Sequence, residues 1–441
     1  MNDEHHTYLG EYQGGYRPGP LSLTGAQRFE HVAVLGTSGV GKSTLLRAIA
    51  VQDIARGDGL LYIDPHGDDA AALLDCIPPS RHNHVCFLQL ADVEWPIALN
   101  VLECDHPDDR AAVADAVVSA VRDIWFDNMV AAPRMENVLR HAILALLHVP
   151  NSTIAQVPRL LTDDLYRRQV VPRVTNPVTR QFFDDRFDEW REAFRAEVVE
   201  PLLTRIDTVL SFPVMLNSLA QHQRTLRIDR AMQGRRIIIC DLSRIPETAA
   251  HVMGALLLAR VRAATLARAR LSVEERRPFH VVVEEVQRYA SHSLPSLLGE
   301  ARKFKVSIAY STQMLSSLTE RTQAAVLGTT GTTVAFRLGP EDAAAIAPKF
   351  DDLHRPFNAA SFNDLRLGEA FIKVGADDVR RVRCAPPAVG FGGAEAVRQQ
   401  SRRHYARPRG DVEGWLEKSL SPIVVADEVH MTIGKPIRKS K

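Results

Sequence analysis

The stretch HVAVLGTSGVGKSTLL, residues 31–46, decides the fold. It starts with an apolar β-branched run, continues through the pattern G-x-x-x-x-G-K-[ST] and leads into an amphipathic helical segment, LLRAIAVQDIA. Glycines after a strand allow a tight loop whose backbone N–H groups, with the N-terminus of the following helix, face a phosphate group. Strand, loop and helix in this order predict a site for a nucleotide.

Each part of this loop has an expected task. Lys42 reaches the β- and γ-phosphate oxygens, and the Ser43 hydroxyl takes one position of a magnesium ion. The residues expected to hold the nucleotide are Gly36, Thr37, Ser38, Gly39, Val40, Gly41, Lys42, Ser43 and Thr44.

A second stretch, FHVVVEEVQRYA at 279–290, ends a buried strand in two adjacent carboxylates. Unpaired charge at such a position is costly, so the pair needs a partner. A carboxylate at a strand end can hold magnesium through water, which is the role expected for Glu284. Glu285 is expected to polarise the water that attacks the γ-phosphate, as a general base. The alternative is a pair of glutamates that face solvent.

A third polar strand end is SIAYSTQ, residues 307–313. Ligands of parallel sheets lie at the carboxyl ends of the strands, so Gln313 is expected to contact the γ-phosphate or the attacking water.

Short β-branched runs alternate with helical stretches along most of the chain. Near-continuous apolar strands separated by helices indicate a mainly parallel sheet covered on both faces, an α/β fold. The expected strands are 31–36, 59–64, 84–90, 236–242, 280–285, 306–312, 332–338 and 369–374.

The segment between the third and fourth of these strands is helical instead. RMENVLRHAILALLHV places apolar residues from Met135 to Leu147 at i, i+3, i+4 spacing, and TIAQ at 153–156 indicates a capping box. We therefore expect an all-helical subdomain at 108–230, inserted into a core formed by 31–107 and 231–375. An N-terminal segment, 1–30, and a basic C-terminal tail, 376–441, complete the expected organisation.

Composition limits the class of protein. With 45% hydrophobic residues in 441, the chain can form a full core. Apolar stretches such as VMGALLLARV fall short of a membrane span, and MNDEHHTYLG lacks a signal pattern. We expect a cytoplasmic protein without direct membrane insertion. The five scattered cysteines are expected to be reduced packing residues.

The formal net charge of +1 gives no strong field for nucleic acid, so any polyanion site must be local. The tail is basic in VRQQSRRHYARPRG (397–410) and IGKPIRKSK (433–441), and we expect it to be solvated and partly disordered. Arginines of PRLLTDDLYRRQ and VPRVTNPVTRQ could contact DNA phosphates, or simply belong to solvated helix faces.

Together these motifs resemble the HerA/FtsK-type hexameric ATPases, and within them the soluble TraG/TraD-like conjugation ATPases, also called type IV secretion coupling proteins. The resemblance covers roughly residues 28–375 and includes YIDPHGD, PIALNVLE, EARKFKVSIAYSTQ and VAFRLGPEDA. It implies a RecA-like core, ATP and magnesium as ligands, a homo-oligomer, most typically a hexamer, and sequence-independent DNA translocation.

The resemblance also implies roles for single residues. Lys42 and Ser43 hold phosphate and metal, Glu284 is the second metal-side acid, Glu285 the base and Gln313 the sensor. Asp64 of YIDPHGD lies near the nucleotide. A ring motor needs a cation from the neighbouring subunit. Arg302 and Arg337 are the candidates, and either could instead form an ordinary surface ion pair.

Two departures from the family pattern matter. The family usually has Asp at the position of Glu284, and the longer side chain is expected to reduce hydrolysis. Only about thirty residues precede the phosphate loop, so neither a membrane anchor nor a HerA-type β-barrel is expected there. Recruitment to the inner membrane would need a partner protein of a secretion system or mobile element.

Three functions remain open from the sequence. The first is an ATP-driven DNA translocase, the second a secretion-type ATPase that threads protein, and the third a nucleotide-dependent scaffold in a defence assembly. DNA-stimulated ATP turnover would favour the first function, and full biological function of a Glu285→Gln variant would favour the third.

Overall fold

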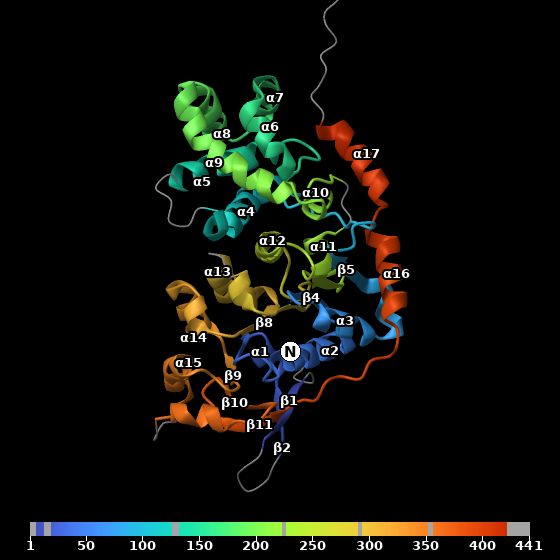
Figure 1. The fold of residues 1–441 in the computed structure, drawn as a ribbon, viewed down its shortest axis with the longest axis vertical. Coiled ribbons are helices and arrows are strands. Elements are labelled where there is room, and N and C mark those ends of the chain that lie inside the picture. The colour runs from blue at the N-terminus through green and yellow to red at the C-terminus, as the bar shows by residue number, and fades with distance from the viewer. Residues whose placement is uncertain are drawn as a thin grey trace, which may run out of the picture.

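The computed structural model describes residues 6–12, 19–125, 132–222, 226–289, 293–351 and 356–420. An eleven-stranded sheet forms the centre of the molecule, in the order β2-β1-β11-β10-β9-β3-β8-β7-β4-β6-β5 (Figure 1). The strands are β1 Thr7–Tyr12, β2 Gly19–Leu23, β3 Val32–Leu35, β4 Gly59–Asp64, β5 Val85–Gln89, β6 Ile237–Asp241, β7 Phe279–Val283, β8 Val306–Thr312, β9 Thr332–Ala335, β10 Glu369–Val374 and β11 Arg380–Cys384.

The sheet is parallel from β9 to β5 and antiparallel at its other edge, where β10, β11, β1 and β2 are added. The predicted mainly parallel α/β fold is therefore confirmed. Each of the eight expected strands forms, but β1, β2 and β11 were not predicted. Two of them lie in the segment expected to precede the core, and the third lies in the segment expected to be a tail.

Helices cover both faces of the sheet. They are α1 Gly25–Arg28, α2 Lys42–Ala55, α3 Asp68–Asp75, α4 Arg110–Trp125, α5 Ala132–Leu146, α6 Val157–Thr162, α7 Asp164–Val170, α8 Pro177–Gln181, α9 Glu192–Leu210, α10 Pro213–Leu219, α11 Ile228–Gln233, α12 Glu247–Ala267, α13 Ser293–Glu300, α14 Glu320–Thr329, α15 Pro340–Ile346, α16 Ala394–Tyr405 and α17 Arg409–Leu420.

Alternating side chains of the strands enter two separate cores. Leu60 and Tyr62 of β4 join α2 and α3 on one face. Leu61 and Ile63 face the other way, into a larger apolar cluster that continues through α12 into the helices beyond it. This is the pattern of a sheet buried on both faces.

The described residues between β5 and β6 form helices and none of the strands of the sheet, and helices α4 to α10 lie together at the top of Figure 1. The apolar residues expected to share one face of α5 are all buried: Met135, Val138, Leu139, Ala142, Ile143, Leu146 and Leu147. The predicted capping box of Thr153 and Gln156 is present and begins a 3-10 turn ahead of α6. The exact domain boundaries stay a prediction.

Helix α12 lies between the sheet and these helices and packs along α4. Together with the turn after it, Glu247–Arg270, it is long and apolar enough to cross a membrane, although 83% of its most apolar window is buried inside the protein. This length was not predicted from the sequence, because Arg260 and Arg262 interrupt the apolar run.

The expectation of a largely solvated tail after residue 376 is wrong for 380–420. Strand β11 belongs to the sheet, and α16 packs against β5 and α3. The Ser401 hydroxyl of α16 accepts a hydrogen bond from the Phe87 N–H of edge strand β5 at 2.7 Å. Helix α17 then reaches the helical segment, where Val412 and Leu416 pack against Ala155 and Ala220. The basic stretch 433–441 lies outside the described residues.

Candidate nucleotide site

A cavity of about 580 Å³ opens at the carboxyl ends of β3, β7 and β8. It brings together five side chains predicted to carry the chemistry: Lys42, Ser43, Glu284, Glu285 and Gln313. The volume lies within the range of about 300–1,000 Å³ that small-molecule sites occupy. The loop residues Ser38, Gly39, Gly41 and Thr44 also line it, whereas Gly36, Thr37 and Val40 do not.

The phosphate loop has the backbone that its glycines predict. Gly41 caps α2 with φ +115°, a conformation that side-chain-bearing residues rarely adopt. A methyl group added at Gly39 would meet nothing within 4 Å, so this part of the loop is open to a ligand. The Lys42 ammonium group donates to the carbonyl oxygens of Gly36 and Thr37, both at 2.7 Å. Burial lowers the pKa of Lys42. A bound phosphate group would replace these carbonyl partners.

Glu284 connects the end of β7 to the phosphate loop. Its Oε2 accepts a hydrogen bond from the Ser43 hydroxyl at 2.6 Å, and its Oε1 accepts one from the Tyr62 hydroxyl of β4. Burial, with the nearby carboxylates of Asp64 and Asp69, raises the pKa of Glu284 to about 8. The carboxylate therefore sits beside Ser43 despite its extra methylene group, and Tyr62 fixes it there.

Glu285 follows in a left-handed backbone conformation, φ 47° and ψ 56°. Its carboxylate accepts a hydrogen bond from Gln313 and lies 3.1 Å from the His66 Nε2 and 2.6 Å from the Arg288 Nε. Burial acts to raise the pKa of Glu285, but the hydrogen bonds from His66 and Arg288 outweigh it and hold the pKa below its usual value. Gln313 thus contacts the expected base directly.

His66 is a site residue that the sequence reasoning missed, although it lies in the quoted YIDPHGD. The buried Asp64 accepts hydrogen bonds from the backbone N–H groups of His66 and Ala70, each at 2.8 Å. Asp64 does not line the cavity, so its part is to shape the turn that carries His66. The sequence did contain a signal for His66: an aspartate at a strand end often accepts a hydrogen bond from the backbone N–H two residues later, and this turn would carry the histidine to the end of the strand.

The donor set fits magnesium only together with a phosphate group. Among the described residues, no group of three or more His, Cys, Asp or Glu side chains could hold a metal ion. Ser43 and Glu284 supply two oxygens, and magnesium commonly takes its remaining ligands from water and phosphate. These two residues would therefore hold an ion that arrives with the nucleotide.

The other end of the cavity was not predicted. Leu367 and Gly368 precede β10, and Arg383 to Pro387 form the end of β11 and the chain after it. Arg383 is held by a hydrogen bond from its Nη1 to the Leu367 carbonyl at 2.9 Å. The sequence RRVRC alternates as an edge strand does, but it was assigned to the tail together with the whole of 376–441.

Neither candidate trans-acting arginine lines the cavity of its own chain. Arg302 lies before the amino end of β8, is 61% exposed and pairs with Glu30 at 2.8 Å. Arg337 follows β9 beside the phosphate loop, where its carbonyl accepts from the Thr37 N–H at 2.9 Å. The Arg337 guanidinium donates to the Leu365 carbonyl. Their action on a neighbouring subunit stays a prediction.

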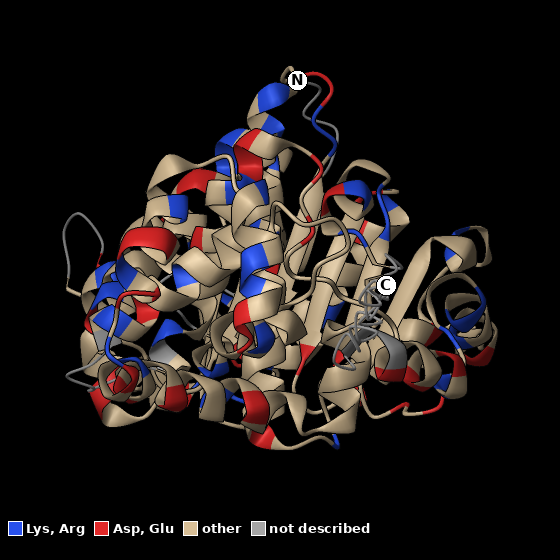
Figure 2. Cartoon of the chain, turned by 90° about the horizontal axis from the view of Figure 1, so that it is seen from above, with Lys and Arg blue, Asp and Glu red and all other residues tan. Residues whose placement is uncertain are grey.

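Several arginines of the helical segment already have partners. Arg167 is 3% exposed and pairs with Asp164 and Asp188, and Arg159 pairs with Asp163 at 3.2 Å. Arg180 donates to the Val174 carbonyl. Figure 2 shows basic and acidic residues interspersed over the helices in this view. Arg168 and Arg173 remain as exposed cations of these two stretches.

Comparison with known protein families identifies the first part of the core. Residues 23–112 match the central domain of the HerA helicase. This match spans β3, the phosphate loop and β4, where Lys42 and Asp64 lie. The predicted resemblance to HerA/FtsK-type ATPases and the predicted P-loop ATPase core are thus confirmed. No curated protein sequence matches the chain.

Solved structures extend this likeness to the whole fold. The bacterial conjugative coupling protein TrwB, lacking its first 70 residues, is similar with a TM-score of 0.62 at 13% identity, over 84% of this chain and 88% of TrwB. TrwB bound to a non-hydrolysable ATP analogue gives 0.62 at 15% identity, over 83% and 87%. VirB4 of Thermoanaerobacter pseudethanolicus gives 0.56 at 14% identity, over 89% and 99%. At these identities the likeness establishes the fold.

Proposed function

We propose that this protein is an ATP-hydrolysing motor that translocates DNA as a hexameric ring, in conjugative transfer or HerA-like DNA processing. The observation that carries the proposal is the single cavity in which Lys42, Ser43, Glu284, Glu285 and Gln313 meet. The similarity to the HerA central domain and to a conjugative coupling protein supports the motor class.

In this proposal each side chain acts on one part of the substrate. Lys42 turns from its loop carbonyls to the β- and γ-phosphates. Ser43 and Glu284 hold magnesium, which neutralises phosphate charge when bound. Glu285 accepts the proton of the attacking water, and Gln313 and His66 orient that carboxylate.

The resting contacts of Glu285 bear on regulation of the same step. The ion pair with Arg288 engages one oxygen of the base, and Gln313 engages the other. Each carboxylate oxygen can accept two hydrogen bonds, so the Glu285 Oε2, which accepts from Arg288, keeps a position for the attacking water. A change in the contact with Arg288 or Gln313 would alter the basicity of this carboxylate, which suits a motor that hydrolyses ATP only with its track in place.

The test is ATP turnover by size-fractionated protein with and without double-stranded DNA. The proposal expects turnover that DNA stimulates and that Glu285→Gln abolishes in an oligomeric fraction. Turnover that DNA leaves unchanged would contradict the DNA part, and a protein without any turnover would contradict the motor itself.

A protein-threading secretion ATPase is the second candidate. It is favoured by the internal contacts of Arg159, Arg167 and Arg180, which are three of the five arginines in the two stretches that could contact DNA. Stimulation of turnover by an unfolded polypeptide but not by DNA would select this candidate.

A further inference from the structure

A second cavity, of about 440 Å³, opens at the amino ends of the parallel strands, whereas the phosphate loop lies at their carboxyl ends. Among its lining residues, Arg235 precedes β6, Pro278 precedes β7 and Lys305 precedes β8, whereas the nucleotide cavity lies where β7 and β8 end. His280 near the start of β7 belongs to this second cavity, and Glu284 just after the end of β7 belongs to the first. Of the roles described above, only that of Arg302 as a candidate trans-acting arginine falls on a residue of this cavity.

Cations dominate its rim: Arg56, Arg235, Arg302, Lys303 and Lys305. Arg56 pairs with Asp53 and Asp58, and Arg302 pairs with Glu30. Within the part of the chain that the structure describes, the side chains of Arg235 and Lys305 have no ion pair or hydrogen bond. Arg235 and Lys305 therefore place two positive charges without an ion-pair partner at the same cavity.

Arg235 and Lys305 also have an unfavourable backbone conformation. Arg235 has φ 52° and Lys305 has φ 54°, in the turns that lead from a helix into β6 and from a 3-10 turn into β8. Glycine is the usual residue at such turns, and a side chain there costs roughly 1–2 kcal/mol. Strained backbone conformations cluster at functional sites, and here two of them occur at charged residues of the same cavity.

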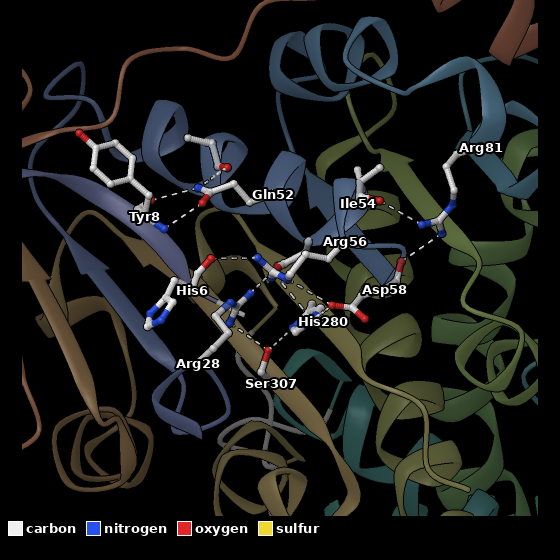
Figure 3. Close-up of polar contacts among 12 residues, drawn as sticks. His6, Tyr8, Arg28, Gln52, Ile54, Arg56, Asp58, Arg81, His280 and Ser307 are labelled. Atoms are coloured by element: carbon white, nitrogen blue, oxygen red, sulfur yellow. Dashed lines mark hydrogen bonds and ion pairs between the residues drawn. The ribbon is translucent and has the colours of Figure 1, made fainter. Parts of the chain in front are cut away.

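The floor of the cavity is a rigid polar network (Figure 3). The Arg28 Nη1 donates to the Ser307 Oγ at 2.9 Å, and Ser307 contacts the His280 Nδ1 at 2.7 Å. The His280 Nε2 then contacts the Asp58 carboxylate at 3.3 Å. Arg28 is 1% exposed, and its buried Nε has no partner. A buried donor thus lies unsatisfied in the cavity wall.

The remaining wall is apolar. The Phe29 ring stacks on His280 with 5.6 Å between ring centroids, and Pro278 and Val273 extend the surface. Val273 is 53% exposed although it is a large apolar residue. A flat ring can lie against this wall while a phosphate group reaches the two cations, because both features line the same cavity.

We propose that this cavity binds one nucleotide unit, with its phosphate on Arg235 and Lys305 and its base against Phe29, Pro278 and Val273. The unit is either a free nucleotide or part of a nucleic-acid strand, since both present the same ring and phosphate. The proposal goes beyond the motor function and does not require hydrolysis at the phosphate loop.

The test uses full-length Lys42→Ala protein, so that the phosphate-loop site contributes little. AMP is titrated by calorimetry, and a labelled single-stranded dT oligonucleotide by fluorescence anisotropy. Saturable binding of AMP identifies a free nucleotide as the ligand, and binding of the oligonucleotide alone identifies a strand. Binding of neither would overturn the proposal.

The decisive variants are Arg235→Gly and Lys305→Gly. Glycine suits the left-handed backbone, so both variants should fold with an equal or higher Tm, while each weakens binding about tenfold by removing one charged contact. Arg244→Gly, which removes an exposed cation from another left-handed turn that lines neither cavity, is the matched control and should leave the affinity unchanged. Equal affinity of wild type and both rim variants would overturn the proposal, and this result would leave the motor function untouched.

Discussion

At the scale of single residues, the two neighbouring glutamates Glu284 and Glu285 have different surroundings. Glu284 faces Ser43 and Tyr62 in a buried site, whereas Glu285 turns through a left-handed backbone toward His66, Arg288 and Gln313. We therefore propose a metal as the ligand of one acid and the attacking water as the ligand of the other.

Glu285→Gln should lower ATP turnover by about 10²–10⁴-fold, because a neutral amide cannot accept the proton of the attacking water. Affinity for ATP should stay nearly unchanged, since the partners of Glu285 are His66, Arg288 and Gln313 rather than the phosphate loop. Turnover assays and nucleotide titration check this. Glu197→Gln, an exposed change on α9, is the control. Undiminished turnover in Glu285→Gln would assign the base to another residue.

Glu284→Asp should reduce rather than improve activity, by about tenfold, although aspartate is usual in the resembling family. The shorter side chain cannot contact the Ser43 and Tyr62 hydroxyls together, and one buried hydroxyl would lose its partner at a cost of roughly 1–3 kcal/mol. Tyr62→Phe should relieve this penalty. Turnover and Tm of the two single variants and the double variant measure the coupling, and strictly additive effects would refute it.

At the scale of elements, His31 joins strand β3 to its neighbours just before the phosphate loop. Its Nδ1 accepts a hydrogen bond from the Ile308 N–H of β8 at 3.1 Å, and its Nε2 donates to the Leu298 carbonyl of α13 at 2.8 Å. Both ring nitrogens are thus used in the neutral form. Burial, with the positive charges of Arg28 and Arg302, lowers the pKa of His31 to about 4.

This lowered pKa predicts acid lability. The unfolded chain binds a proton near pH 6.5 but the folded one only near pH 4, so stability is present above pH 6.5 and is lost as the pH falls toward 4. The loss should reach about 3 kcal/mol. Denaturant unfolding at pH 7 and pH 4.5 measures it. His31→Asn should weaken the pH dependence, whereas His106→Asn, an exposed change, should not; equal slopes would contradict the assignment.

At the scale of the whole molecule, the last described segment connects distant parts of the fold. This segment leaves β11, passes the nucleotide cavity at Pro386 and Pro387, covers β5 with α16 and reaches the helical segment with α17. The nucleotide site and the helical segment thus share one continuous stretch of chain.

Nucleotide binding should stabilise the whole fold, because the ligand binds only the folded cavity. A non-hydrolysable ATP analogue at about 100 times its Kd should add about 2.7 kcal/mol and raise Tm by several degrees. Lys42→Ala should abolish most of the shift, whereas Arg403→Ala, which removes an exposed cation from α16, should retain it. An equal shift in Lys42→Ala would place the nucleotide elsewhere.

The sequence by itself determined the phosphate loop, the eight strands and the paired acids, because these depend on local patterns: glycine spacing, runs of β-branched residues and polar residues at strand ends. Only the tertiary structure decided which distant groups complete the site. His66 and Arg383 line the cavity, and Tyr62 contacts Glu284, because strand pairing places distant segments side by side, and no spacing along the chain records that pairing. For the same reason, the basic stretch 397–410 suggested a solvated tail, whereas pairing of β11 with β10 and packing of α16 on β5 make this segment part of the fold.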